Sequence, residues 1–314
     1  MQNHISIAIN AVLPMFLIIG TGYLVRRAGR LDEPDLQKFN EVGFRLFLPC
    51  HLFMTIWRAD FRSTIPPSFM VLVVACTLLV FLLAAVFTQP MKGSPQRGVL
   101  IQGIFRSNFI LIGIPLITYL CGEESSSATS VVISVIVPLF NVLAVTALCV
   151  FKGERVSLRK VLKDILTTPL VLGSILGFSA RLLQLPLDSF PPLMSALNSL
   201  SQIATPLLLF ILGASFQSSG VSRYKGLLSI CLIVRLVIVP FFAMLTGSLM
   251  GFRGQYLCIL LAVFGSPCAS SSYILAQQMG GDVELAEDIV VIGTAVSCFS
   301  MSVWITVLKQ LALI

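Results

Sequence analysis

The sequence predicts an all-α integral membrane protein of ten transmembrane helices, built as two inverted five-helix repeats with broken crossover helices 4 and 9. Composition gives the first reason, because 56% of the 314 residues are hydrophobic and only 11% are charged. In a soluble protein roughly 25% are charged. Prolines at matching positions in the two halves give the second reason, and two Gly-x-Pro interruptions of apolar runs give the third.

Apolar runs follow one another along the whole chain, with only short links between them. A membrane-spanning helix needs about 20 mainly apolar residues, and ten stretches meet this requirement. We expect spans at 5–25, 37–57, 67–89, 97–120, 128–151, 165–184, 192–216, 226–250, 254–278 and 286–310.

The distribution of Lys and Arg predicts that both termini lie outside. With the N-terminus outside, the inner links hold 13 of these cations, whereas the outer links and the C-terminus hold five. Inner loops of membrane proteins are enriched in Lys and Arg. This distribution also accounts for the net charge of +7, so we expect no nucleic-acid partner. Arg26 and Arg27 follow the first apolar run, whereas a cleavable signal peptide has its cations before it.

Three pairs of prolines relate the two halves of the chain. Their members are separated by 155, 157 and 152 residues and occur in the same order. Five crossings per repeat would give the halves opposite orientations. We therefore expect a first repeat at 1–153 and a second at 154–314. The pairs are Pro14 with Pro169, Pro49 with Pro206, and Pro115 with Pro267.

The fourth and ninth segments carry the strongest functional signal, Gly113-Ile-Pro115 and Gly265-Ser-Pro267. Proline lacks an N–H and glycine allows unusual dihedrals, so we expect both helices to open there. Broken helices occur at membrane depth where the freed groups line a cavity. A half-helix N-terminus carries roughly +0.5 charge and suits an anion. The simpler alternative is a pair of proline kinks.

Polar side chains near these breaks are candidate substrate contacts. Asn108 precedes Pro115 by about two turns and could bind substrate or tie down the freed backbone. Ser270, Ser271 and Ser272 follow Pro267 closely. Their hydroxyls could cap the second half-helix or contact the ligand.

Several charged side chains lie inside the expected spans. An arginine at a helix centre costs about 2.5 to 3.5 kcal/mol. Arg106 could pair with an anionic substrate or extend to the inner surface, and Arg235 presents the same choice. Arg45 has a partner one turn earlier in Glu41, which indicates a structural pair. His51 could relay protons or simply pack.

The remaining residues exclude several classes of function. The acidic residues lie in loops or near segment ends, which disfavours a cation antiporter and favours an anionic substrate. Only two histidines are present, with no His-x-x-x-His, Gly-x-Ser-x-Gly or phosphate-binding glycine loop. The eight cysteines lack Cys-x-x-Cys spacing and suit apolar packing. We therefore expect no enzymatic activity, metal or cofactor.

The stretch from Asn108 to Leu116, with its Gly-Ile-Pro-Leu, resembles the fourth helix of the auxin efflux carrier family. Asn40 followed by Leu48-Pro49 and Pro267 followed by small residues are similar to the family pattern too. The resemblance covers nearly the whole chain. It implies a scaffold of segments 1, 2, 6 and 7 and a mobile transport unit of segments 3–5 and 8–10. It also implies small organic anions as substrates.

Plant auxin exporters of this family carry a long central loop, whereas the central link here spans only about 152–164. We therefore expect a bacterial-type secondary carrier of a carboxylate or auxin-like acid, working by alternating access in the cytoplasmic (inner) membrane. The alternatives are a sodium- or proton-coupled carrier of another substrate class and a non-transporting membrane receptor. The expected partners are the anion and the lipid bilayer. The sequence leaves the coupling ion, the direction of flux and a homodimer open.

Overall fold

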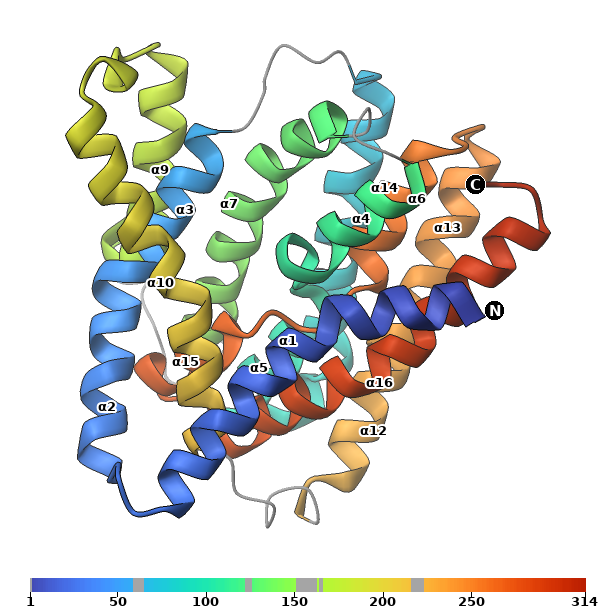
Figure 1. Ribbon diagram of the computed structural model, residues 1–314. Coiled ribbons are helices and arrows are strands. Elements are labelled where there is room, and N and C mark those ends of the chain that lie inside the picture. The colour runs from blue at the N-terminus through green and yellow to red at the C-terminus, as the bar shows by residue number, and fades with distance from the viewer. Residues whose placement is uncertain (1, 59–64, 122–125, 151–162, 164–165, 216–222) are drawn as a thin grey trace.

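The computed structural model describes residues 2–58, 65–121, 126–150, 163, 166–215 and 223–314, which are helical apart from links and one isolated β-bridge (Figure 1). The first half comprises α1 (Gln2–Arg27), α2 (Glu33–Val42), η1 (Gly43–Phe47), α3 (Leu48–Trp57), α4 (Pro67–Phe87), η2 (Gln89–Met91), α5 (Pro95–Phe105), η3 (Phe109–Gly113), α6 (Ile114–Cys121) and α7 (Ser126–Val150). The second half comprises α9 (Pro169–Leu182), η5 (Leu187–Ser189), α10 (Pro191–Ser215), α12 (Lys225–Ile233), η6 (Val234–Ile238), α13 (Val239–Leu249), α14 (Gln255–Gly265), α15 (Ser271–Met279) and α16 (Val283–Gln310).

Long apolar helices confirm an integral membrane protein. Within the described residues, five helical stretches are long and apolar enough to cross a membrane, and two shorter helices are also apolar. The expected second, fourth and ninth spans are each divided among shorter elements. The five long stretches are Pro67–Phe87, Val131–Val150, Pro191–Ser215, Lys225–Leu249 and Val283–Gln310.

Three π-helical turns, η1, η3 and η6, each end two residues before a proline. These prolines are Pro49, Pro115 and Pro240. Proline has no N–H, and its ring clashes with the carbonyl four residues back. The hydrogen bonds therefore shift to a π pattern: the N–H groups of Leu48 and Val239 donate to carbonyls five residues back. Proline here changes the helix without breaking it.

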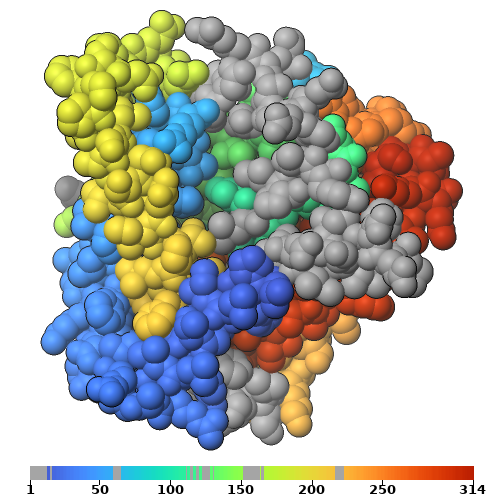
Figure 2. Space-filling view, viewed as in Figure 1, coloured from blue at the N-terminus to red at the C-terminus, as the bar shows by residue number. Residues whose placement is uncertain are grey.

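Two helix pairs, α1 with α10 and α3 with α9, approach each other closely through glycines. A Cβ on Gly22 would lie 2.0 Å from the carbonyl oxygen of Phe210 on α10. A Cβ on Gly173 of α9 would lie 2.6 Å from the carbonyl oxygen of Pro49 on α3. Small residues permit such close packing in membranes. Figure 2 shows α10 in yellow lying against α1 to α3 in blue on one face of the molecule.

Replacing Gly22 with Ala should destabilise the protein, because the added methyl group would overlap the backbone of α10. Overpacking of this kind costs about 1–3 kcal/mol. Gly20→Ala is the matched control on α1, since no atom lies within 4 Å of its added Cβ. Thermal unfolding of the purified variants in detergent should show a lower midpoint for Gly22→Ala alone. Equal midpoints for both variants would contradict the close packing.

Candidate functional site

Two helices are interrupted by extended backbone, and these interruptions form the centre of the candidate site. The first lies between α5 and η3, where Arg106 has a ψ angle of 126°. The second lies between α14 and α15, where Ser266 has a ψ angle of 151°. The Gly265-Ser-Pro267 motif therefore marks the second break, as predicted.

The predicted place of the first break is wrong. The chain opens at Arg106–Asn108 and not at Gly113–Pro115. Pro115 is the second residue of α6, where the π turn η3 accommodates its missing N–H. Gly113 instead allows η3 to approach α14, because a Cβ there would lie 2.8 Å from the Cβ of Ala262. Gly113 is not among the residues that line the cavity described below.

The two extended stretches pair with each other through their backbones. Ser107 and Cys268 form an antiparallel β-bridge, and the N–H of Asn108 donates to the carbonyl oxygen of Pro267 at 2.8 Å. Backbone groups freed at membrane depth must find partners inside the protein. Each break therefore helps to satisfy the other, and Pro267 contributes through its carbonyl oxygen.

Arg235 on η6 binds the C-terminal ends of the two helices that precede the breaks, α5 and α14. Its guanidinium donates to Ile104 and Phe105 at the end of α5, both at 3.2 Å. It also donates to Val263 at 3.1 Å and to Ser266 at 2.9 Å, at the end of α14. All four acceptors are backbone carbonyl oxygens. The side chain is buried. Arg235 therefore has a structural role, which differs from both alternatives considered from the sequence, a substrate contact and an extension to the inner surface.

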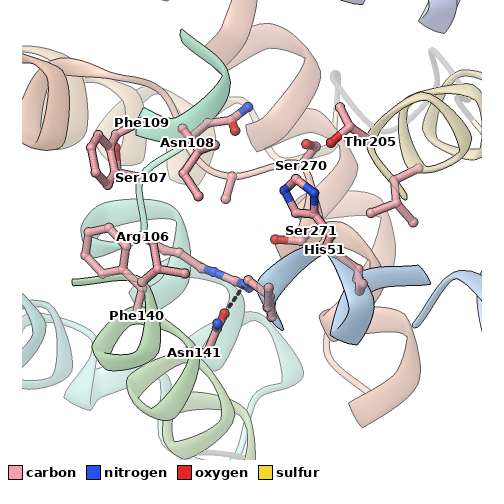
Figure 3. A pocket seen from close by; sticks show the side chains of 16 residues that line it. His51, Arg106, Ser107, Asn108, Phe109, Phe140, Asn141, Thr205, Ser270 and Ser271 are labelled. Atoms are coloured by element: carbon pink, nitrogen blue, oxygen red, sulfur yellow. Dashed lines mark hydrogen bonds between the residues drawn. The ribbon is translucent and has the colours of Figure 1, made fainter. Parts of the chain in front are cut away.

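A cavity of about 80 Å³ lies between the two breaks and the helices α3, α7 and α10 (Figure 3). One water needs roughly 10–15 Å³ on this scale, so the cavity has room for a small polar group. Among the lining residues that the structure describes there is no carboxylate. The polar side chains that line it are His51, Arg106, Ser107, Asn108, Asn141, Thr205, Ser270 and Ser271.

Arg106 is the central charge of the cavity wall. It is 3% exposed, which contradicts the alternative of an extension to the inner surface. Its Nη2 donates to Asn141 Oδ1 at 2.9 Å, and its Nη1 donates more weakly to Gln102 and Ser272, at 3.3 and 3.5 Å. Among the residues that the structure describes, no carboxylate forms an ion pair with it. The described hydrogen-bond partners of this positive charge are therefore all neutral side chains.

Polar atoms without a described hydrogen-bond partner belong to the same cavity lining as Arg106. The Nδ2 of Asn108 and the hydroxyl of Ser107 are buried and have no hydrogen-bond partner within the described residues. Ser270 takes the N-cap position of α15 but makes no capping hydrogen bond, so its predicted capping role is not observed. Ser271 lines the cavity, whereas Ser272 is not among the described lining residues and accepts a hydrogen bond from Arg106. The arrangement offers hydrogen-bond donors to a ligand.

The opposite wall comes from α3 and α10, with His51 and Thr205. The Nδ1 of His51 lies 3.3 Å from the hydroxyl of Ser201 on α10. In Figure 3 His51 lies near Ser270 and Ser271. The histidine therefore belongs to the cavity as well as to the packing of α3 on α10.

Asn141 and Ser174, which were not among the site residues expected from the sequence, hold Arg106 in place. Asn141 accepts from Arg106, and its Nδ2 donates to the hydroxyl of Ser174 on α9 at 3.2 Å. An asparagine inside an otherwise apolar run was the available signal. Glu287 and Asp288, which we placed at a segment end, are buried near the start of α16 but lie outside the cavity lining.

A helical membrane protein with two interrupted helices around a buried polar cavity belongs to the class of membrane transporters. A family model described as "Membrane transport protein" matches the chain twice, at residues 7–158 and 154–305. The chain therefore belongs to this family, that of the auxin efflux carriers.

Archaeal relatives support this assignment over almost the full chain. An uncharacterized transporter of Methanocaldococcus jannaschii is 23% identical over 307 residues, which cover 95% of this chain and 98% of the relative. An uncharacterized transporter of Methanothermobacter thermautotrophicus is 22% identical over 304 residues, which cover 95% of this chain and 97% of the relative.

A disulfide can test the pairing of the two breaks. Residues facing each other in an antiparallel pair have Cα atoms about 4.5–5.5 Å apart, within the range that a disulfide spans. Ser107→Cys should therefore crosslink to the native Cys268 under mild oxidation, as detected by peptide mass spectrometry. Ser107→Cys combined with Cys268→Ala is the control. A folded Ser107→Cys protein without the crosslink would contradict the bridge.

Proposed function

We propose that this protein is a secondary carrier of a small organic anion, such as a carboxylate or an auxin-like acid, and that it works by alternating access. The observation that carries the proposal is the buried positive charge of Arg106, which lines a cavity with no carboxylate among its described lining residues. A buried charge is costly unless it is paired. An anionic substrate would supply the missing partner.

Hydrogen-bond donors of the cavity suit the same ligand. Asn108 Nδ2 and the Ser107 hydroxyl are buried and unpartnered, so each can donate to a carboxylate oxygen. The first residues of α15 add the positive end of a helix dipole beside Ser270 and Ser271. Hydrogen bonds to a charged partner are shorter and roughly twice as strong as those between neutral groups. We infer that substrate selection depends on these donors.

The finer architecture of this proposal is ten spans in two inverted repeats, 1–153 and 154–314. Support comes from the family model, which matches once in each half. The glycine contacts add support, because they join the first span to the seventh and the second to the sixth. These four would form the scaffold, and spans 3–5 and 8–10 would form the transport unit, with α5–α6 and α14–α15 as crossover helices.

The two walls of the cavity support the proposal of alternating access. One wall belongs to the proposed scaffold, through α3 and α10, and the other to the proposed transport unit, through the two breaks and α7. Rigid-body movement of one unit against the other would carry a bound anion between the two sides. The excess of Lys and Arg in the inner links supports a cytoplasmic-membrane orientation with both termini outside.

A negative charge introduced at Asn108 provides a direct test. Asn108→Asp should reduce carboxylate uptake into proteoliposomes at least about tenfold, since an added carboxylate repels the substrate and pairs with Arg106. Asn198→Asp is the matched control, because Asn198 accepts from Arg58 at 2.9 Å outside the cavity lining. The control should transport at the wild-type rate. Wild-type uptake by folded Asn108→Asp would contradict the proposed site.

A further inference from the structure

Arg235 gathers four backbone carbonyl oxygens that belong to two different half-helices. Its Nε, Nη1 and Nη2 donate to the ends of α5 and α14, at 2.9 to 3.2 Å. The side chain is 1% exposed. A helix C-terminus carries roughly −0.5 charge, so two such ends together attract about one positive charge.

Converging carbonyls of this kind form a cation site in other broken-helix carriers. There, half-helix C-termini and unwound carbonyls coordinate the coupling sodium ion or proton, while half-helix N-termini face the anionic group. In this protein the guanidinium of Arg235 already donates hydrogen bonds to the carbonyl oxygens at the C-terminal ends of α5 and α14.

We propose that Arg235 is a built-in cation, which occupies the carbonyl site where a coupling metal cation would otherwise bind. This proposal deepens the proposed function and rests on it, because it assumes that the paired breaks are the transport site. The carrier accordingly needs no sodium at the crossing of the two breaks. Arg235 is not among the described residues that line the cavity, and it is therefore a positioning residue.

The two buried arginines then have separate tasks. Arg235 donates to backbone carbonyl oxygens, whereas Arg106 lines the cavity and, within the described part of the chain, donates to neutral side chains. The fixed charge of Arg235 balances the helix ends permanently. The charge of Arg106 is left for a substrate that comes and goes.

Removal of the Arg235 side chain should leave a site for a small cation. Arg235→Ala vacates the guanidinium but keeps the four carbonyl oxygens, so free guanidinium or sodium should bind there. Purified Arg235→Ala should unfold at a lower temperature than wild type. Guanidinium or sodium chloride at tens of millimolar should raise its midpoint by at least about 2 °C over the same concentration of choline chloride.

Two controls make the experiment specific. Arg181→Ala removes an arginine that stacks over Trp57, away from the carbonyl site, and should show no such cation response. Wild type should show none either, and its carboxylate uptake should stay within about twofold when choline replaces sodium. The thermal measurement contains no carboxylate, so its result does not depend on the proposed anion transport. If the anion proposal fails, carboxylate uptake will be absent while the cation response of Arg235→Ala remains.

Folded Arg235→Ala that responds to neither guanidinium nor sodium would overturn the proposal. A sodium-specific stabilisation of wild type would also overturn it. This measurement on wild type tests the proposal even if Arg235→Ala does not fold. Arg235→Lys supplies a further variant, because its ammonium keeps the charge but has only three N–H donors on a single nitrogen for the four carbonyl oxygens. It should be less stable than wild type and unresponsive to sodium.

Discussion

The backbone pairing of the two breaks is the constraint on which the rest of the structure depends. Ser107 and Cys268 face each other in an antiparallel bridge, and Asn108 donates to Pro267. Without this pairing, extended backbone at membrane depth would leave polar groups unsatisfied. With it, the helix ends on each side of the breaks have fixed positions, and the cavity beside them has fixed walls.

Two buried arginines, Arg235 and Arg106, serve different parts of this paired structure. The helix ends that precede the breaks bind Arg235, and the stretches within and after the breaks line the cavity with Arg106. Asn141 and Ser174 hold Arg106 without neutralising it, since both are uncharged. A permanent positive charge with neutral supports is an arrangement that favours a bound anion. The family match and the physical chemistry of the cavity therefore lead to the same class of protein, a membrane transporter.

Much of the site was predictable from sequence, because polar residues stand out against an apolar chain. Asn108, Arg106, Ser270 and Ser271 were identified in this way and lie together. The position of the first break was not predictable, because Gly113-x-Pro115 has the same pattern as Gly265-x-Pro267 yet is absorbed by a π turn. The partners of Arg235 come from elements far apart in sequence, so only the fold could assign its role.

Paired ligands measure most directly whether the cavity binds a negative charge, as we propose. Thermal unfolding of the purified protein can be followed with a panel of small mono- and dicarboxylates, each compared with its uncharged amide. We expect that at least one carboxylate raises the midpoint saturably while its amide does not. Equal shifts for carboxylates and amides, or binding of the amides alone, would contradict it.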